Sequence, residues 1–231
     1  MNALNIRNVS EIKHYYDSNE YVNDAESYAR THRKERLSLI SKYVDYENLR
    51  NVLEVGCGSG VHKNDFNNYV GVDISITALE KAKPANLVLA SADNLPFKNC
   101  SFELVISFNL IEHLYNPERF LDESLRVCKR QGFVVISSPH LLKRKLISNL
   151  FNNFLMYLKM RVLKEKYRLN ILFKQPDYTK IGGDADAVYL TDLQDIMLYF
   201  KSRNCKIINE KRHKFLFFLT RTTEGLIIAK K

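Results

Sequence analysis

The feature that most constrains the fold is a series of short apolar runs separated by helix-length segments. The runs are NVLEV (51–55), YVGVD (69–73), NLVLA (86–90), FELVISF (102–108) and FVVIS (133–137). Runs that are nearly continuously apolar are typical of parallel strands covered on both faces. Their alternation with helical segments predicts an α/β protein with a doubly wound, mostly parallel sheet, closed by strands near 205–210 and 225–230.

Helix signals fill the segments between the runs. An amphipathic pattern over 19–44 predicts a long helix ahead of the first run. Ser75 is a suitable N-cap for a helix that Pro84 would end, because proline lacks the backbone N–H that a helix interior needs. Asn116-Pro117 predicts the start of another helix, and a further helix is expected at about 191–203.

Residues 141–180 break this rhythm. Apolar side chains between Ile147 and Leu158 fall on one helical face, which predicts one or two helices inserted after the fifth strand. The stretch 141–175 holds nine Lys and Arg and a single acid, so it carries eight of the nine net positive charges of the chain. Three interpretations remain open: a lid with solvated lysines, an interfacial helix on anionic lipid, and a phosphate-tracking RNA surface.

Composition narrows the class of protein further. With 231 residues, 45% of them hydrophobic, the chain is long and apolar enough for one domain with a full core. No apolar run reaches the length of a membrane span, and the first residues lack the order of a signal peptide. The four cysteines are widely spaced and form no CxxC pair, which favours reduced thiols over a disulfide framework or a zinc site. We therefore expect a cytoplasmic protein.

The stretch VLEVGCGSG (52–60) places three glycines directly after the first run. Gly56 and Gly58 allow the backbone to turn sharply and approach a ligand more closely than a Cβ atom would permit. A P-loop would read GxxxxGK[ST], and a dinucleotide turn would place its third glycine one residue later than Gly60. Glu54, just before the turn, is unfavourable beside a pyrophosphate but suits an ammonium or sulfonium group.

Four motifs in this order resemble those of the class I S-adenosylmethionine-dependent methyltransferases, in the type 11, ubiquinone-methylase-like group. VLEVGCGSG is similar to the first family motif, hh[D/E]hGxGxG. YVGVDIS (69–75), SADNLPF (91–97) and SFELVISFNLIEHL (101–114) are similar to the next three, so the resemblance covers about residues 48–140. It implies a Rossmann-like, seven-stranded fold, S-adenosylmethionine as cofactor and S-adenosylhomocysteine as product.

The resemblance also implies roles for individual residues. Asp73 would accept hydrogen bonds from both ribose hydroxyls, Ile74 would pack on the adenine, and Asp93 would accept from the adenine amino group. Glu54 would bind the cofactor's amino group or a water, and a buried structural role is the alternative. The implied cofactor-binding set is Glu54, Gly56, Cys57, Gly58, Gly60, Asp73, Ile74, Ala92, Asp93, Asn94, Asn109 and Arg30.

The N-terminal helix resembles the lid that covers the cofactor in this family. Arg30, or Arg33 in its place, would pair with the methionine carboxylate, and a solvated helix face is the alternative. Cys57 is interpreted as a small turn residue and not as a nucleophile.

The candidate general bases lie after the fourth and fifth strands. His113 and His140 are expected to border the ligand crevice, and the near-neutral reference pKa of histidine suits either to general-base work. A packing role is the alternative for His113. The substrate-facing candidates are Tyr16, Asp184, Asp186 and Tyr189. No metal site is expected.

The expected organisation has four parts: an N-terminal helical lid (1–45), a cofactor-binding core (46–140), a helical substrate-binding insertion (141–190) and a C-terminal helix with closing strands (191–231). The expected function is transfer of a methyl group to an O or N atom of a small molecule, such as a sugar or lipid-linked intermediate. An RNA methyltransferase and a non-catalytic cofactor-binding regulatory protein are the alternatives. We expect a monomer or homodimer without nucleic acid, with peripheral membrane contact through 141–175 as one option.

Overall fold

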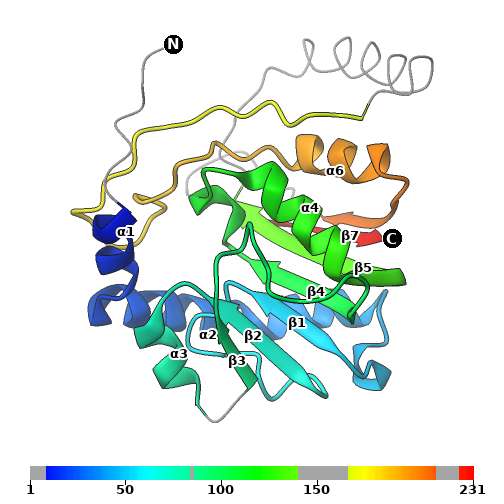
Figure 1. Cartoon of the computed structure of the whole chain (residues 1–231), viewed down its shortest axis with the longest axis horizontal. Helices are drawn as coiled ribbons and strands as arrows, with labels where there is room; N and C mark the ends of the chain where they lie inside the picture. The colour runs from blue at the N-terminus through cyan, green and yellow to red at the C-terminus, as the bar shows by residue number, and fades with distance from the viewer. Residues whose placement is uncertain (1–8, 84–85, 140–165, 212–223) are drawn as a thin grey trace.

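The computed structural model describes residues 9–83, 86–139, 166–211 and 224–231. They contain a seven-stranded sheet of order β3-β2-β1-β4-β5-β7-β6 (Figure 1). The strands are β1 (Val52–Val55), β2 (Tyr69–Asp73), β3 (Asn86–Leu89), β4 (Phe102–Phe108), β5 (Cys128–Pro139), β6 (Lys206–Lys211) and β7 (Glu224–Lys230). β1 pairs in parallel with β2 and β4, β2 with β3, and β4 with β5. β7 runs antiparallel to β5 and β6. The predicted doubly wound, mostly parallel sheet is confirmed.

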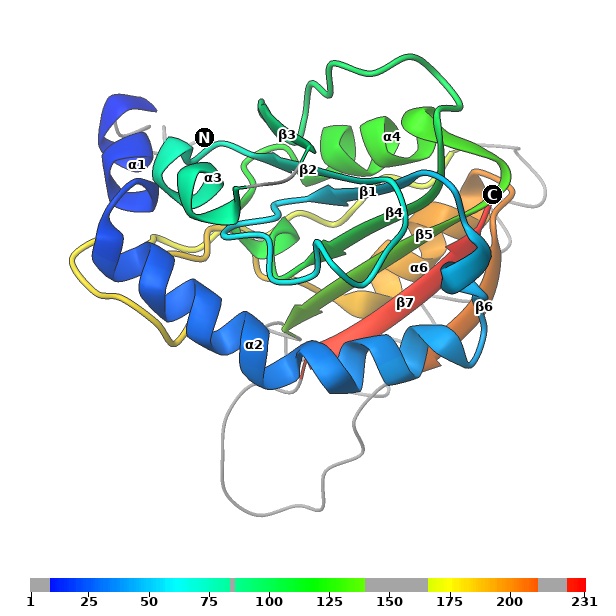
Figure 2. The same cartoon turned by 90° about the horizontal axis from the view of Figure 1, so that it is seen from below.

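Helices cover both faces of the sheet (Figures 1 and 2). The helical elements are α1 (Val9–Tyr16), α2 (Asn19–Ser41), η1 (Tyr46–Asn48), α3 (Ile76–Ala82), η2 (Ile111–His113), α4 (Pro117–Val127) and α6 (Leu193–Ser202). One core cluster packs Phe120 of α4 and Phe200 of α6 against the sheet, and the other packs Ile40 of α2 and Leu79 of α3. Burial of both faces explains why the strands read as nearly continuous apolar runs.

The strand predictions are close to the observed bounds. The strands expected at 69–73 and 102–108 are β2 and β4 with the same bounds, and Ser75 caps α3 by accepting a hydrogen bond from Ala78 N. β5 is longer than the predicted run, because the strand starts at Cys128, directly where α4 ends. Between the glycine turn and β2 the chain forms a series of turns and no helix.

The predicted inserted helices over 141–180 fall partly outside the described residues, since 140–165 are not described. In the described part, 166–180, the helical prediction is wrong: the chain is irregular there. Carboxylates of the neighbouring helices bond its backbone donors: Leu169 N donates to Glu118 Oε1 at 2.6 Å and Asn170 N to Asp195 Oδ2 at 3.1 Å. These bonds to tertiary partners satisfy backbone N–H groups that a helix would otherwise pair locally.

No helix in the described part of the chain is both long enough and apolar enough to cross a membrane.

Candidate functional site

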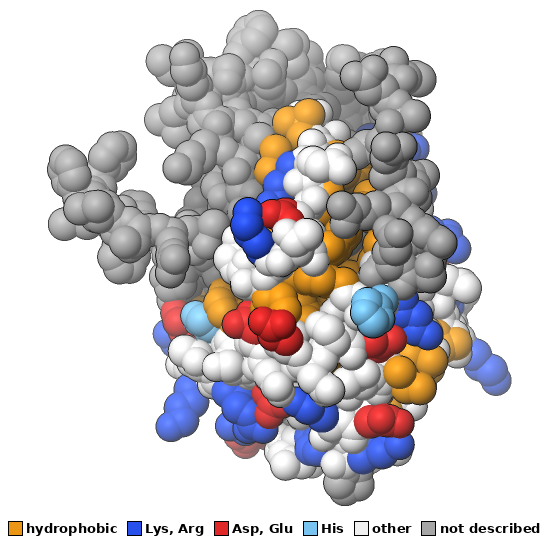
Figure 3. Space-filling view, turned by 90° about the vertical axis from the view of Figure 1, so that its left-hand side faces the viewer, with side chains coloured by type: hydrophobic (Ala, Val, Ile, Leu, Met, Phe, Trp, Pro, Cys, Tyr) orange, Lys and Arg blue, Asp and Glu red, His pale blue; other side chains and the backbone are white. Residues whose placement is uncertain are grey.

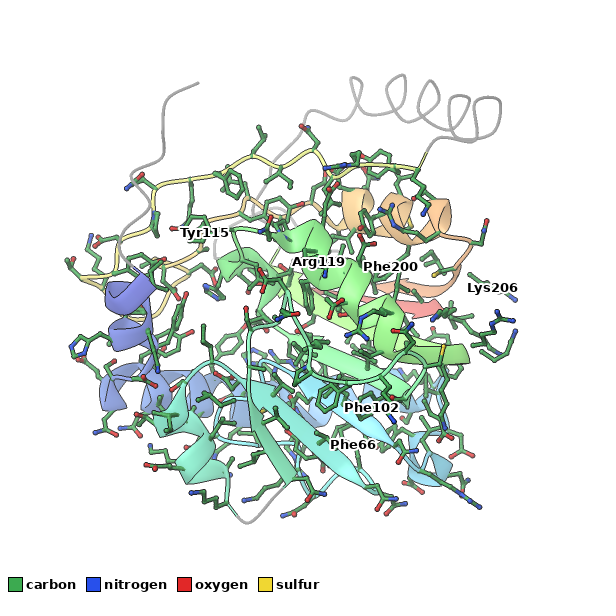
Figure 4. All side chains as sticks on the ribbon, viewed as in Figure 1. Phe66, Phe102, Tyr115, Arg119, Phe200 and Lys206 are labelled. Carbon is green, nitrogen blue, oxygen red and sulfur yellow. The ribbon has the colours of Figure 1, made fainter. Side chains whose placement is uncertain are left out.

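The candidate site lies at the edge of the sheet where the parallel strands end. In Figure 4, Phe102 marks the start of β4, and Tyr115, which follows η2, lies at the opposite end of the sheet. Ligands of open α/β sheets bind beyond the carboxyl ends of the strands, where the strand order reverses. β1 lies between β2 and β4, so the reversal falls between β1 and β4.

Hydrogen bonds fix the glycine turn after β1. Gly56 N and Cys57 N both donate to Val72 O, at 2.8 and 3.0 Å, which ties the turn to β2. Gly56, Gly58 and Gly60 all have positive φ, at 74°, 50° and 68°. A Cβ atom on Gly60 would lie 2.9 Å from the Cβ of Ala82, so both the backbone angle and the space require glycine there. At Gly58 a Cβ atom would meet no atom within 4 Å, so this part of the turn faces open space.

Asp73, at the tip of β2, is held by two backbone groups. Its Oδ2 accepts from Gly58 N at 2.8 Å and its Oδ1 from Ser75 N at 2.9 Å. Burial raises the pKa of Asp73, while these N–H donors oppose the rise. Each carboxylate oxygen has a further lone pair, so the carboxylate can still accept a pair of hydroxyl groups. Ile74 beside it is 41% exposed, which leaves an apolar face uncovered next to an anchored acid.

The third motif forms a turn after β3. Ala92 is buried, Asn94 is exposed, and Asn94 N donates to Ser91 O at 3.1 Å. Asp93 accepts from Ser91 Oγ at 2.6 Å through Oδ1 and from the Arg119 side chain at 3.2 Å through its carbonyl oxygen. These local bonds fix the loop. Among the contacts of the described residues none uses Asp93 Oδ2, so this oxygen can accept a hydrogen bond from a ligand.

Glu54 has both carboxylate oxygens bonded within the protein. His62 Nδ1 lies 2.8 Å from Glu54 Oε1, and Tyr69 Oη donates to Glu54 Oε2 at 2.6 Å. All three side chains are buried. This geometry favours the structural alternative over direct binding of the cofactor's amino group. The sequence pattern does not indicate His62 as the partner, because the pairing depends on how the turns after Gly60 fold back.

Three arginines of α2 have different environments. Arg30 is exposed and bonds Glu26 of the same helix, and Arg33 pairs with Asp65. Arg36 is 4% exposed, donates to Asn109 Oδ1 and lies over the Phe108 ring, 4.8 Å from its centroid. Arg36 therefore brings a guanidinium to the end of β4. The sequence pattern missed it, because nothing in the helix periodicity distinguishes it from Arg30 and Arg33.

His113, with a side chain 13% exposed, and the buried Asp186 form an ion pair across 73 residues of sequence. His113 Nδ1 lies 3.0 Å from Asp186 Oδ2, and His113 Nε2 lies 3.8 Å from Glu112 Oε1. Burial alone would lower the pKa of His113, but the pairing with Asp186 and the charges of Glu112 and Asp184 together outweigh it and raise the pKa to about 9. Burial raises the pKa of Glu112 to about 7. At neutral pH the His113 ring is therefore protonated and paired.

A group of tyrosines covers this ion pair. The Tyr16 ring lies 6.3 Å from the His113 ring, and Tyr15, Tyr16 and Tyr21 contact one another with centroids 4.9 to 5.2 Å apart. Burial raises the pKa of Tyr21, and the charges of Asp186 and Asp73 raise it further. Tyr21 thus lies within electrostatic reach of both the candidate ribose acid and the candidate acceptor acid.

The other substrate-facing candidates have different positions. Tyr189 is fully buried, and its backbone N–H donates to Glu112 O at 2.9 Å. Asp184 is half-buried with φ of 56°, and its carbonyl oxygen accepts from Lys174 Nζ at 2.6 Å. His140 lies outside the described residues. Of the predicted acceptor-side set, the structure brings together Tyr16, His113 and Asp186.

The stretch that carries most of these candidate residues is similar to a known family. A family model described as a methyltransferase domain matches residues 53–136, which include the glycine turn, Asp73, Asp93 and Asn109. Two uncharacterized proteins of Methanocaldococcus jannaschii are each 31% identical to the chain, over 67% and 68% of its length. The chain spans 62% and 73% of these relatives' own lengths.

The chain belongs to the class I S-adenosylmethionine-dependent methyltransferases. The fold agrees with this family. The structure of magnesium protoporphyrin IX methyltransferase from Synechocystis, solved with bound SAH, has a TM-score of 0.61 at 12% identity, and the match covers 96% of this chain and 98% of that one.

The residues of this methyltransferase fit S-adenosylmethionine, its cofactor. The turn leaves open space at Gly58, the anchored carboxylate of Asp73 can accept from hydroxyl groups, and Ile74 presents an uncovered apolar face, which are features that such a cofactor needs. A cofactor without phosphate needs no helix N-terminus after the glycine turn, and the turns at 61–68 provide none.

Replacing Asp186 by asparagine should lower the pKa of His113 from about 9 to near or below the ordinary value of about 6.5. Without the carboxylate, burial of the ring dominates and disfavours its charge. Titration of the His113 ring followed by NMR checks this, with Asp177→Asn as the matched control. A pKa that stays near 9 in Asp186→Asn would show that another group charges the ring.

The same pair predicts a pH dependence of stability. The pKa of His113 is raised in the folded state, so the pair stabilises the protein fully below about pH 6.5 and loses this contribution as pH rises toward 9. The free energy of unfolding should therefore fall over this range, and fall less in Asp186→Asn. Chemical denaturation at a series of pH values measures it, and equal slopes for both proteins would contradict it.

Proposed function

We propose that this methyltransferase moves a methyl group from S-adenosylmethionine to an N or O atom of a small molecule bound beside His113 and Asp186. The observation that supports this is the turn between α1 and α2, which contacts both groups of candidate residues. Asp17 Oδ1 accepts from Ser75 Oγ at 2.9 Å, and Ser75 N bonds Asp73, while the ring of the adjacent Tyr16 lies 6.3 Å from the His113 ring. These contacts favour a cofactor and an acceptor in adjoining parts of one site.

S-adenosylmethionine, when bound, supplies an activated methyl group on a sulfonium sulfur. The chain's own contribution is alignment and exclusion of water, since an in-line displacement needs little more. Tyr16, which lies against His113 and contacts Tyr15 and Tyr21, helps to exclude water from the ion pair, and two backbone N–H groups fix the Asp73 carboxylate. A base role for His113 requires that acceptor binding lowers its pKa, because the paired ring is already protonated at neutral pH. An acceptor that attacks without a base, such as a neutral amine nitrogen, suits the paired state better.

Arg36 is our proposal for the group that binds the methionine carboxylate. Arg36→Gln should weaken S-adenosylmethionine binding about 10-fold, because a buried guanidinium makes stronger hydrogen bonds to a carboxylate than a neutral amide does. Arg36→Lys keeps the charge but loses the fork geometry of the guanidinium, so its affinity should lie between those of wild type and Arg36→Gln. Isothermal titration measures the affinity, and thermal unfolding controls for loss of the Asn109 bond.

Arg30→Gln is the matched control, since Arg30 is exposed and bonds only to Glu26 among its described contacts. A larger loss for Arg30→Gln than for Arg36→Gln would instead support the assignment made from the sequence pattern.

The activity itself is tested by S-adenosylhomocysteine formation with a panel of small amine and hydroxyl acceptors. Turnover that is lost in Asp73→Ala supports the proposal. Tight cofactor binding without turnover of any acceptor supports the non-catalytic regulatory alternative. RNA binding that weakens steeply with salt would support the RNA methyltransferase alternative, whose basis in 141–175 lies mainly outside the described residues.

A further inference from the structure

We propose that Asp17 is a positioning residue for this site: its carboxylate docks the α1–α2 turn on Ser75, the residue that orients the candidate ribose acid Asp73. The proposal rests on the proposed function, which it deepens by naming how the N-terminal lid (α1 and α2) is set against the cofactor end of the site. In this role Asp17 need not touch the cofactor or the acceptor, since it acts through Ser75.

Two hydrogen bonds lead from the lid to the cofactor acid. Ser75 Oγ donates to Asp17 Oδ1 at 2.9 Å, and Ser75 N donates to Asp73 Oδ1 at 2.9 Å. Ser75 is 3% exposed, so little water competes for its hydroxyl. One buried serine therefore bonds an acid of the lid with its side chain and the candidate ribose acid with its backbone.

Capping of α3 does not account for the Asp17 carboxylate. Ser75 already caps this helix, since its Oγ accepts from Ala78 N at 3.1 Å. Thr77 N lies 3.4 Å from Asp17 Oδ1, which is long for a hydrogen bond to a charged oxygen. A serine hydroxyl has a single proton to donate, and Ser75 donates it to Asp17. The main bond of this carboxylate therefore joins the lid to the cap of α3.

The turn that carries Asp17 is fixed within the lid. Asp17 N donates to Lys13 O at 2.9 Å, and the Ser18 side chain caps α2. Figures 1 and 2 both place α3 beside α1 and the start of α2. A second contact, from Lys81 Nζ of α3 to Asn23 Oδ1 of α2, lies further along both helices. The turn and the start of α2 therefore dock on α3 together.

The same turn reaches the acceptor side of the site. Tyr16, next to Asp17 in the chain, has its ring 6.3 Å from the His113 ring. Tyr15 Oη donates to Lys180 O at 2.9 Å, which joins the lid to the loop on this side. Figure 3 shows this side of the molecule, where acidic side chains gather beside hydrophobic and histidine side chains. Asp17 thus fixes the lid at the cofactor end, and the tyrosines contact the acceptor end.

These contacts link docking of the lid to cofactor binding. A ribose held by Asp73 would fix that carboxylate, and with it the Ser75 backbone that bonds it. A fixed Ser75 presents its hydroxyl to Asp17 in one orientation. Linkage is reciprocal, so a docked lid strengthens cofactor binding by the same factor by which the cofactor strengthens docking.

Isothermal titration of the full chain with S-adenosylhomocysteine tests the role of Asp17. Asp17→Ala should lower the affinity about 10-fold, because the bond between Ser75 and a charged acceptor is lost. Asp17→Asn keeps an acceptor oxygen for Ser75 Oγ and should stay within about 3-fold of wild type. Asp24→Ala, which removes an exposed acid of α2, is the control and should bind normally. Wild-type affinity in Asp17→Ala would overturn the proposal.

A double-mutant cycle with Ser75→Gly separates positioning from a general effect on the lid. Glycine removes the hydroxyl and is tolerated at an N-cap, so α3 should persist. If Asp17 acts through that hydroxyl, Asp17→Ala made in Ser75→Gly should lower the affinity further by less than about 2-fold. Losses that multiply in the double variant would show that Asp17 acts independently of Ser75, and the proposal would be wrong. Thermal unfolding shows that each variant is folded at the temperature of titration.

Hydrogen exchange of the lid gives a readout that does not depend on turnover. Saturating S-adenosylhomocysteine should slow exchange of the backbone amides of 15–22 at least about 5-fold in wild type, and less in Asp17→Ala. Equal slowing in both proteins would contradict a link through Asp17.

The same titrations separate this proposal from the proposed function. If wild type does not bind S-adenosylhomocysteine, both fail. If wild type binds it and Asp17→Ala binds it equally well, only the role of Asp17 fails. If wild type binds it and methylates no acceptor of the panel, the proposed function fails while the titrations still decide the role of Asp17.

Discussion

Replacing Asp73 by alanine is expected to lower the affinity for S-adenosylmethionine by at least about 100-fold. Two hydrogen bonds from ribose hydroxyls to a carboxylate contribute roughly 1.5–3 kcal/mol each, and their joint loss corresponds to that factor or more. The variant also removes the acceptor of Gly58 N and Ser75 N, so the glycine turn loses the contact that fixes it against β2.

Isothermal titration of Asp73→Ala, Asp73→Asn and wild type measures this effect. Asp73→Asn keeps one acceptor oxygen and should lose less affinity than Asp73→Ala. Glu80→Ala, in the exposed part of α3, is the control and should bind normally. If Asp73→Ala binds S-adenosylmethionine with wild-type affinity, Asp73 does not bind the ribose and this edge of the sheet is not the cofactor site.

Replacing Glu54 by alanine is expected to destabilise the fold by about 3 kcal/mol or more. The substitution leaves His62 and Tyr69 buried without the acceptor that both now use, and unpaired buried polar groups are costly. For a chain of this length the loss corresponds to a fall of roughly 10 °C in the midpoint of thermal unfolding. Glu47→Ala on the surface should change the midpoint little.

The same experiment decides between the two roles that the sequence left open for Glu54. If Glu54 is structural, Glu54→Gln should bind S-adenosylmethionine nearly as well as wild type at a temperature where both are folded. If instead Glu54→Gln keeps its stability and loses cofactor affinity, Glu54 binds the cofactor's amino group and the structural interpretation is wrong.

Residues 141–190 show where sequence reasoning reached its limit. An apolar stripe predicted helices up to residue 180, yet the described residues 166–180 are irregular. Helix periodicity reports which side chains share a face, and it does not show that Glu118 and Asp195 supply acceptors for the backbone of this segment. Those acceptors come from α4 and α6, which are distant in sequence and known only once the chain is folded.

The sequence by itself determined the sheet, the glycine turn and the family, because each depends on residues close together in the chain. Apolar runs, a glycine-rich turn and an acid at a strand tip each depend on residues that are neighbours in the chain, so the sequence shows them directly. Only the tertiary structure decided which side chains pair: Asp186 with His113 and Arg36 with Asn109 across long sequence distances, and His62 with Glu54 through the turns that follow Gly60. A side chain's charge state and role depend on what packs against it, and packing between distant segments leaves no periodic trace in the sequence.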